Sequence, residues 1–239
     1  MKSKLPVFTM ALMMLCLSFS TTLQSQVLIS LLFGDKLNSD NIKFGLDGGL
    51  NFSHLTRTDG AKFRYDFNLG LYFDIRLKAN TGWYLHTGVL LKSEMGARDV
   101  DVYSLGDPGL DSMFVGGSVK RQLKYINIPA LVRYKFRKHF FCEIGPMIGI
   151  MTRATDVFYN KVEKREDLSY KIRVTDQYCW FDAGLEAGIG YQLMKGTGVN
   201  FGIRYYQGFV NTAKNSASGQ VWNQSVYLFV SIPIGAGKK

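Results

Sequence analysis

Histidine, cysteine and proline are scarce in this chain. Its 239 residues include three histidines, three cysteines and five prolines. A zinc site needs three or four ligands close together, and neither His86 nor His139 has such a cluster around it, so we expect no metal and no cofactor. Beyond the N-terminal segment, no apolar run approaches the ~20 residues of a membrane-spanning helix. That absence excludes a helical inner-membrane protein.

The first 25 residues have the layout of a secretory signal peptide. Two lysines lie within the first four residues, the stretch 5–19 is almost entirely apolar, and small and polar residues follow over 20–26. This order is typical of a cleaved export signal. We expect cleavage near Ser25–Gln26, which leaves 26–239 as the mature β-barrel domain. Cys16 lacks the small preceding residue that a lipid anchor requires, so we interpret it as part of the apolar run.

Basic residues outnumber acidic ones. The chain has 29 lysines and arginines against 19 aspartates and glutamates, a net charge of +10, and removal of the two lysines of the signal segment lowers it to +8. A nucleic-acid surface shows clustered basic residues, and no run of adjacent basic residues with interleaved aromatics occurs. We therefore expect no nucleic-acid partner, and a basic surface that faces anionic lipid.

Apolar and polar residues alternate along most of the mature chain. Between Phe67 and Leu77 the odd-numbered residues are apolar, whereas the even-numbered ones are asparagine, glycine, tyrosine, aspartate and arginine. A period of two places the two sets on opposite faces of a β-strand. The pattern predicts eight strands, over Ile42–Phe52, Phe67–Leu77, Trp83–Lys92, Lys124–Phe136, Phe140–Met151, Tyr178–Gln192, Val199–Phe209 and Trp222–Ile234.

The connections between these strands are alternately long and short. The long ones are Ser53–Asp66, Ser93–Leu123, Thr152–Gln177 and Val210–Val221, and the short ones are Ala79–Gly82, Arg137–His139 and Leu193–Gly198. Outer-membrane barrels combine tight periplasmic turns with longer external loops, whereas a soluble sandwich has no reason to sort its connections in this way. We therefore predict an all-β fold, an eight-stranded antiparallel up-and-down transmembrane β-barrel in the cell outer membrane.

Three observations indicate that the apolar set faces lipid and the polar set faces the barrel axis. Between the strand ends the apolar set has no charged residue, and Lys124 is the nearest exception. Glycines fall almost wholly in the polar set, where they make room for bulky neighbours in a narrow lumen. Aromatic residues of the apolar set gather near both strand ends, as in the two interfacial girdles of such barrels. The expected bulky lumen residues are Tyr72, Tyr84, Tyr125, Trp180, Tyr206 and Tyr227, and the expected girdles are Phe44, Trp83, Phe136, Phe140 and Tyr191 on one side and Phe52, Phe67, Phe209 and Trp222 on the other.

A barrel of this kind has to close, because hydrocarbon offers no hydrogen bonds to an open sheet edge. We therefore expect the last strand to pair with the first. Pro129, Pro146 and Pro233 each remove a ladder donor, so we expect bulges or strand ends there. Cys142 and Cys179 lie about eight residues apart along neighbouring strands, or roughly 25 Å. That distance is too long for a disulfide, and both are expected to be free thiols that face lipid.

Five stretches resemble the small porin-like outer-membrane β-barrel proteins, the family that includes the secretion component PorT. They are Phe33–Leu37 (FGDKL), Phe44–Phe52 (FGLDGGLNF), Tyr125–Tyr134 (YINIPALVRY), Phe181–Tyr191 (FDAGLEAGIGY) and Arg204–Tyr206 (RYY). The resemblance implies a β-barrel fold and an outer-membrane location. Most members of the family have no assigned activity, so the resemblance implies no particular function.

The polar set contains charges of both signs. Its acidic members are Asp47, Asp74, Glu143, Asp182 and Glu186, and its basic members are Lys43, Arg76, Arg133, Lys135 and Arg204. An isolated charge in a small lumen would cost several kcal/mol, so these residues have to pair. The first interpretation is a salt-bridged plug that fixes the interior. The second is a narrow or gated polar path, although eight strands leave little open cross-section.

A catalytic site on the external rim is a further hypothesis. Ser53 and His54 open the first long connection with Asp59 nearby, and Asp99 and Asp101 lie in the second. Serine, histidine and aspartate are the members of a nucleophilic triad. Their spacing matches no motif, however, and we predict no enzymatic activity and no catalytic residue.

The external connections show no specific ligand. Thr152–Gln177 contains six basic and five acidic residues, which is typical of a hydrated surface that contacts lipopolysaccharide or another envelope protein. The apolar stretch Val27–Phe33 suggests a short periplasmic helix or strap. Our first hypothesis is a non-enzymatic barrel with a structural, surface-interaction or envelope-assembly role. The alternatives are a narrow passive channel and the rim enzyme.

Overall fold

The structure is a computed structural model that describes residues 38–39, 41–79, 81–136, 139–163, 166–193, 198–214 and 219–234. The expected signal peptide and the stretch Val27–Phe33 lie outside the described residues. Within the described ranges, no helix is long and apolar enough to cross a membrane.

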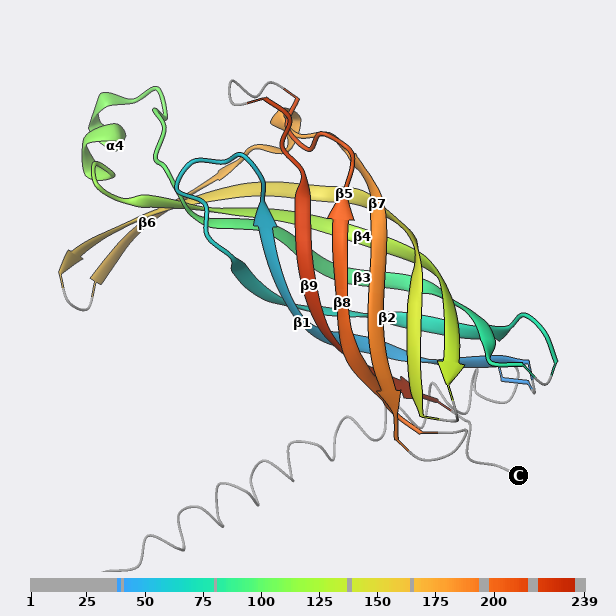
Figure 1. The fold of residues 1–239 in the computed structure, drawn as a ribbon. Coiled ribbons are helices and arrows are strands. Elements are labelled where there is room, and N and C mark those ends of the chain that lie inside the picture. Colours follow the sequence, from blue (N-terminus) through green and yellow to red (C-terminus); the bar gives the residue numbers. More distant parts are fainter. Residues whose placement is uncertain are drawn as a thin grey trace, which may run out of the picture.

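Eight antiparallel strands close into a ring (Figure 1). The elements are β1 (Ile42–Leu55), β2 (Arg64–Arg76), β3 (Trp83–Val100), α4 (Pro108–Met113), β4 (Ser118–Phe136), β5 (Phe140–Glu163), β6 (Glu166–Arg173), η2 (Thr175–Gln177), β7 (Phe181–Gln192), β8 (Asn200–Gly208) and β9 (Asn223–Pro233). Each ring strand pairs with its neighbour in the chain except that β5 pairs with β7, and β9 returns to pair with β1. The predicted barrel and its closure are confirmed. β6 is an additional strand that pairs with β5 outside the ring.

The apolar set faces outward, as predicted. Large apolar side chains are exposed on every ring strand, among them Leu50, Phe67, Leu91, Ile128, Ile144, Ile189, Ile203 and Val230. Tyr72, Tyr125, Tyr206 and Tyr227 are buried toward the axis. Phe44 lies on this outward set beside its cross-strand partner Phe73, with 5.1 Å between ring centroids, although it is only 4% exposed. One individual expectation is wrong. Trp180 is 66% exposed because β7 begins one residue later, so this side chain lies in the preceding bend.

Two kinds of close contact explain why glycine occurs at these positions of the polar set. A Cβ atom at Gly49 would collide with the carbonyl oxygen of Leu228, and one at Gly70 would collide with that of Val89. Backbone atoms cannot move aside, so these glycines permit a close approach of neighbouring strands. At Gly190, a Cβ atom would instead collide with the ring of Phe141. That second case is the room for a bulky neighbour that the pattern predicted.

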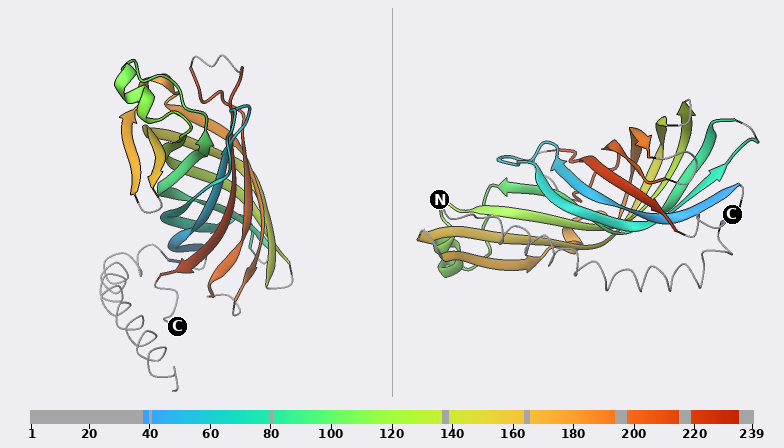
Figure 2. Two further views of the ribbon diagram at one scale, coloured as in Figure 1. Left: turned by 90° about the vertical axis from the view of Figure 1, so that its left-hand side faces the viewer. Right: turned by 90° about the horizontal axis from the view of Figure 1, so that it is seen from below.

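Three strands are longer than the alternation predicted. β3 ends at Val100 rather than Lys92, β4 begins at Ser118 rather than Lys124, and β5 ends at Glu163 rather than Met151. Figures 1 and 2 show these extensions leaving one end of the ring together, with β6 and α4 beside them. The second and third long connections were expected to be loops, and most of their length is instead an ordered sheet outside the ring.

A one-residue bulge explains why the extension of β5 escaped the pattern. The register between β4 and β5 shifts by one residue at Thr152. On the ring side of the shift Met147 and Met151 are buried, and beyond it Ala154 and Phe158 are buried. An extra residue exchanges the two faces of a strand. The strict alternation therefore ends at the bulge while the strand continues.

The prolines only partly follow expectation. Pro233 is the last residue of β9, as predicted. Pro129 and Pro146 lie within β4 and β5, and the β4–β5 register is the same on both sides of them. Ala130 and Leu131 have no partner in that ladder. The missing N–H donors are therefore accommodated by a gap in the ladder, and the predicted bulges at these two positions are wrong.

Both cysteines are free thiols, as predicted. Cys142 alternates with the lumen residue Glu143 on β5 and therefore faces outward. Cys179 precedes β7, and its N–H donates to the carbonyl oxygen of Thr212 at 2.8 Å. It lies in an external connection, so the expectation that it faces lipid is wrong.

Candidate functional site

Ion pairs fill the half of the lumen that lies toward the short turns. Arg133 on β4 donates to Asp74 at 2.8 Å through Nη1 and to Glu143 at 2.7 Å through Nε. Arg204 on β8 donates to Glu143 at 2.6 Å through Nε and to Asp47 at 2.9 Å through Nη1. All five side chains are almost fully buried. This arrangement is the salt-bridged plug of the first interpretation.

His86 belongs to the same network. Its Nδ1 lies 2.7 Å from Asp74, and its Nε2 lies 3.0 Å from Nη2 of Arg204. Nε2 also lies 3.6 Å from Asp47, so the imidazole ring connects Asp74, Arg204 and Asp47. The alternation predicted that His86 lies in the lumen. It could not predict a role for this residue, because its partners come from strands that are distant in the chain.

The charges of the plug balance. Its four carboxylates, Asp47, Asp74, Glu143 and Glu186, face four cations, Arg133, Arg204, Lys135 and Lys43. Lys135 lies 3.7 Å from Asp74, and Lys43 is the cross-strand partner of the same aspartate. A cavity of about 10 Å³ beside Asp47, Glu186 and Arg204 is the space left at this level, about enough for one water molecule.

Two of the ten predicted lumen charges lie outside the plug. Asp182 accepts a hydrogen bond of 2.8 Å from Asn223, nearer the external end. The guanidinium of Arg76 lies 5.8 Å from the ring centroid of Tyr84.

The other half of the lumen contains tyrosines among buried polar side chains. Tyr125, Tyr206 and Tyr227 lie there with Met147, together with the buried residues Asn51, Asn127, Asn223, Ser53, Ser93 and Ser225. Beyond the ring, an apolar core continues into the external sheet through Leu55, Met95, Leu123, Ala154, Phe158 and Val221. The alternation predicted the lumen tyrosines but not the external core, because apolar residues point outward in the membrane and inward beyond it.

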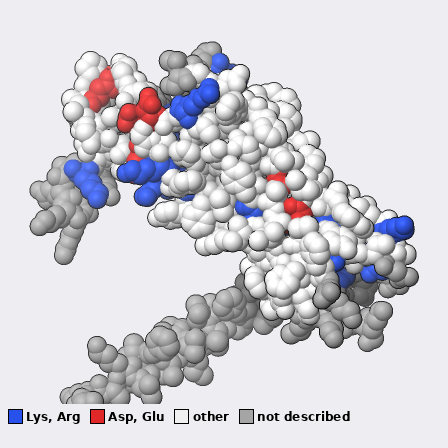
Figure 3. Space-filling view, viewed as in Figure 1, with Lys and Arg blue, Asp and Glu red and all other residues white. Residues whose placement is uncertain are grey.

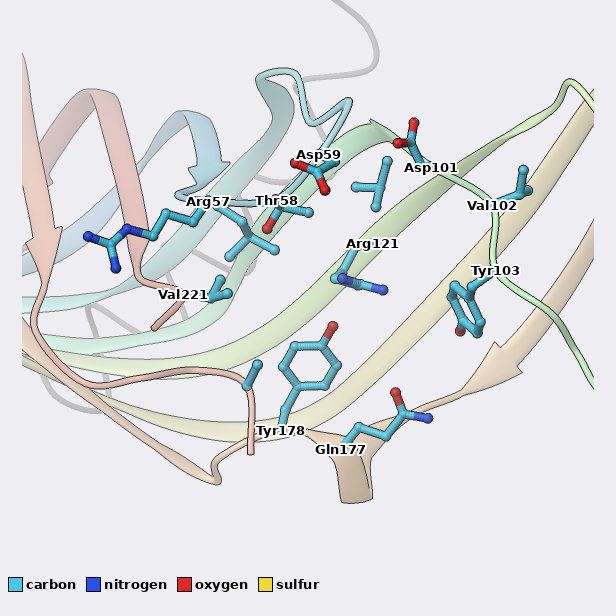
Figure 4. Close-up of a pocket in the computed structure, with 13 residues that line it drawn as sticks. Arg57, Thr58, Asp59, Asp101, Val102, Tyr103, Arg121, Gln177, Tyr178 and Val221 are labelled. Atoms are coloured by element: carbon cyan, nitrogen blue, oxygen red, sulfur yellow. The ribbon is translucent and has the colours of Figure 1, made fainter. Parts of the chain in front are cut away.

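A cavity of about 410 Å³ lies at the outer end of this core (Figure 4). All four long connections contribute to its lining, together with Arg121 of β4. The contributing segments are 55–59 after β1, 100–103 after β3, 177–178 before β7, and Ala213 and Val221 between β8 and β9.

Backbone hydrogen bonds hold these connections to one another. The N–H of Thr56 donates to the carbonyl of Trp222 at 3.0 Å, and the N–H of Lys214 donates to that of Gln177 at 2.9 Å. Tyr178 and Ala213 form an isolated antiparallel bridge. The pocket is therefore fixed by the main chain and does not depend on side chains alone.

A buried ion pair supports one wall of the pocket. Arg121 donates to Asp156 through Nη2 at 2.7 Å and through Nε at 3.0 Å. The hydroxyl of Tyr103 donates to the same carboxylate at 3.0 Å, and the Arg121 guanidinium lies 5.5 Å from the ring centroid of Tyr178. Burial raises the pKa of both tyrosines well above its usual range, and the Asp156 carboxylate adds to this effect on Tyr103. Both phenols are therefore protonated donors. The sequence alone does not indicate this group, because Tyr103, Arg121, Asp156 and Tyr178 come from separate segments and form no local motif.

Asp99 links the outer ends of two strands. Its carboxylate accepts a short hydrogen bond from the hydroxyl of Tyr159 on β5 and forms an ion pair of 3.2 Å with Lys62. The hydrogen bond from Tyr159 lowers the pKa of Asp99. Asp99 has a φ of 57°, a left-handed conformation that aspartate and asparagine tolerate better than most residues.

The hypothetical rim triad is not assembled. Ser53 and His54 are consecutive residues of β1 and point to opposite faces of the strand. Ser53 is buried, whereas the ring of His54 packs 5.2 Å from that of Phe63. Asp59 and Asp101 line the external pocket, and Asp99 pairs with Lys62. Across the described ranges, no three histidine, cysteine or acidic side chains cluster as metal ligands would.

Charged side chains are concentrated at the two ends of the molecule. Figure 3 shows acidic and basic residues on the external layer and basic residues at the opposite end, and the ring surface between them is mostly uncharged, with a few charged side chains visible on it. The uncharged band corresponds to the exposed apolar residues of the ring. A closed ring with an apolar outer band and a filled axis is the architecture of an integral outer-membrane β-barrel.

Comparison with known proteins agrees with this class. Residues 29–214 match the family described as "Outer membrane protein beta-barrel domain". The chain belongs to this family, and it is an integral protein of the cell outer membrane. The resemblance to small outer-membrane barrels that the sequence carries is confirmed.

Solved structures of small barrels are similar to this chain. The attachment invasion locus protein Ail of Yersinia pestis has 13% identity and a TM-score of 0.40, with 81% of this chain and 98% of that chain covered. Neisserial surface protein A has 9% identity and a TM-score of 0.41, with 81% and 99% covered. OprG from Pseudomonas aeruginosa has 15% identity and a TM-score of 0.35, with 81% and 93% covered. No curated protein sequence matches the chain.

Proposed function

We propose that this protein is a non-enzymatic outer-membrane barrel that acts at the cell surface by binding a ligand in its external layer. One contrast supports this function. The lumen is filled by balanced ion pairs and by tyrosines among buried polar side chains, whereas the four external connections are tied together around a cavity of about 410 Å³.

The outer rim also suits contact with lipopolysaccharide. Lys92 lies 3.5 Å from the ring centroid of Phe67, and the partly exposed Lys124 forms an ion pair with Glu94 at 2.9 Å. Lysines beside an aromatic girdle lie at the depth of anionic headgroups. Lipopolysaccharide is therefore the lipid partner that we propose.

Planar-bilayer recording of the purified barrel tests this function against a passive channel. We expect no discrete openings, because the plug leaves room for about one water molecule beside Arg204. A large barrel porin recorded in the same bilayers serves as the positive control. Steady, discrete openings of the wild-type protein would contradict the closed barrel and favour the channel.

A further inference from the structure

We propose that the pocket at the outer end of the barrel binds a neutral saccharide of one or two sugar rings. This inference rests on the proposed surface-binding function and names the ligand class of that site. It is carried by the charge, the hydrogen-bonding groups and the aromatic walls of the pocket.

The lining has no net charge to offer an anion. Arg57 and Arg121 are matched by Asp59 and Asp101, and the buried Asp156 neutralises Arg121 from behind. Arg57 extends away from Arg121 and Tyr178, and its guanidinium lies 5.2 Å from the ring centroid of Trp222 (Figure 4). A phosphate or carboxylate would therefore meet three acidic groups and two basic ones. An uncharged ligand avoids that repulsion.

The polar groups can both donate and accept. Arg121 uses Nε and Nη2 for Asp156 and lies along the cavity lining. The Tyr178 hydroxyl points toward Arg121 (Figure 4). Gln177 adds an amide on the same side of the cavity. Sugar hydroxyls both donate and accept, so they can satisfy this mixed set.

Aromatic and aliphatic walls suit the C–H faces of a sugar ring. Tyr103 is held by its bond to Asp156 and by an edge contact with Phe158 at 4.9 Å between centroids, yet it remains partly exposed at the cavity. Val100 and Val221 line the remaining wall. A fixed tyrosine offers a large contact area at a low cost in conformational entropy.

The size and rigidity of the cavity fit a small ligand. Its volume of about 410 Å³ lies near the lower end of the ~300–1,000 Å³ that is typical of small-molecule sites. The backbone bonds between the four connections form it without a ligand, which lowers the entropic cost of binding.

Saturation-transfer NMR on the full-length mature protein tests the ligand class. The barrel is placed in lauryldimethylamine oxide micelles, because this detergent has no sugar headgroup. The probes are methyl α-D-glucopyranoside, N-acetylglucosamine and maltose, with glucuronate as the anionic comparison. We expect saturation transfer to at least one neutral sugar and none to glucuronate.

Two variants locate the binding. Gln177→Ala and Tyr178→Phe each remove one hydrogen-bonding group, and we expect each to raise the dissociation constant of the bound sugar about 3- to 10-fold. Asp176→Ala is the matched control, since Asp176 lies in η2 beside Gln177 but outside the lining, and its affinity should be unchanged. Heat-modifiable gel migration confirms that each variant has folded.

Three results would overturn the inference. They are saturation transfer to none of the three neutral sugars, transfer confined to glucuronate, and equal weakening in Asp176→Ala and Gln177→Ala. None of these results implies that the barrel conducts ions. The proposed surface-binding function would therefore stand, with a ligand of another class. Channel openings in the bilayer experiment would instead remove that function.

Discussion

Arg204 connects four strands of the ring through its guanidinium. From β8 it reaches Asp47 on β1, Glu143 on β5 and His86 on β3. In a lumen without bulk water, such a charge is tolerated because every neighbour is paired with it. The plug is therefore a set of mutually dependent side chains, and removal of one member affects the rest.

Replacement of Arg204 by alanine is expected to destabilise the barrel strongly. The change leaves the buried Asp47 without its arginine and Glu143 with Arg133 alone, and the loss of one partner of a buried pair costs about 3–5 kcal/mol. The free energy of unfolding in urea, followed by tryptophan fluorescence in micelles, should fall by that amount. Arg57→Ala removes the same charge from an exposed position, and its effect should stay below about 1 kcal/mol. Equal losses in the two variants would show that the lumen pairs do not stabilise the fold.

The sequence predicted which individual residues face the lumen, but it did not predict which of them form ion pairs. A period of two places Asp47, Asp74 and Glu143 on the axis side, as found. The pattern carries no information about which distant strand supplies the partner of each residue. The role of His86 in the network follows only from the positions of Asp74 and Arg204 on either side of its ring.

Strand boundaries were predicted well inside the membrane and poorly beyond it. Lipid requires uninterrupted alternation in β1 and β2, whereas β3 and β5 contain bulges as they leave the ring. Beyond Thr152, the buried residues of β5 are Ala154, Asp156 and Phe158, so the face that is polar in the membrane becomes largely apolar. The alternation along the sequence therefore fails beyond Thr152, and this failure predicts a loop.

The contact of Asp99 with β5 is expected to weaken in acid. The pKa of Asp99 is lower in the folded chain than in the unfolded one, so the unfolded state takes up its proton first as the pH falls. The stabilisation is fully present at neutral pH and is lost as the pH falls through the folded pKa. Amide-exchange protection of residues 95–100 should therefore decrease as the pH falls below about 4.

Asp99→Asn provides the control for this prediction. Asparagine tolerates the φ of 57° at this position but does not titrate. Protection of residues 95–100 in this variant should vary less with pH than in the wild-type protein, once intrinsic exchange rates are removed. The same loss of protection in both proteins would assign the pH dependence to another group.

The whole molecule combines a sealed transmembrane ring with an ordered external layer. The ring was predictable because the membrane acts on every residue of every strand, so sidedness appears directly in the sequence. The pocket was not predictable, because Thr58, Tyr103, Arg121 and Tyr178 come from separate segments and form no local motif. The family match extends over 29–214 and agrees with the fold.

Spin-label accessibility in lipid vesicles tests the orientation of the two faces most directly. Nitroxides are attached to Leu71→Cys, Ile203→Cys and Gln177→Cys in a protein whose Cys142 and Cys179 are replaced by alanine. Labels at Leu71 and Ile203 should collide mainly with dissolved oxygen, which partitions into lipid. The label at Gln177, in the external layer, should collide mainly with a water-soluble nickel chelate. Frequent nickel collisions at Leu71 or Ile203 would contradict the assignment of the apolar face to lipid and of the charged face to a sealed axis.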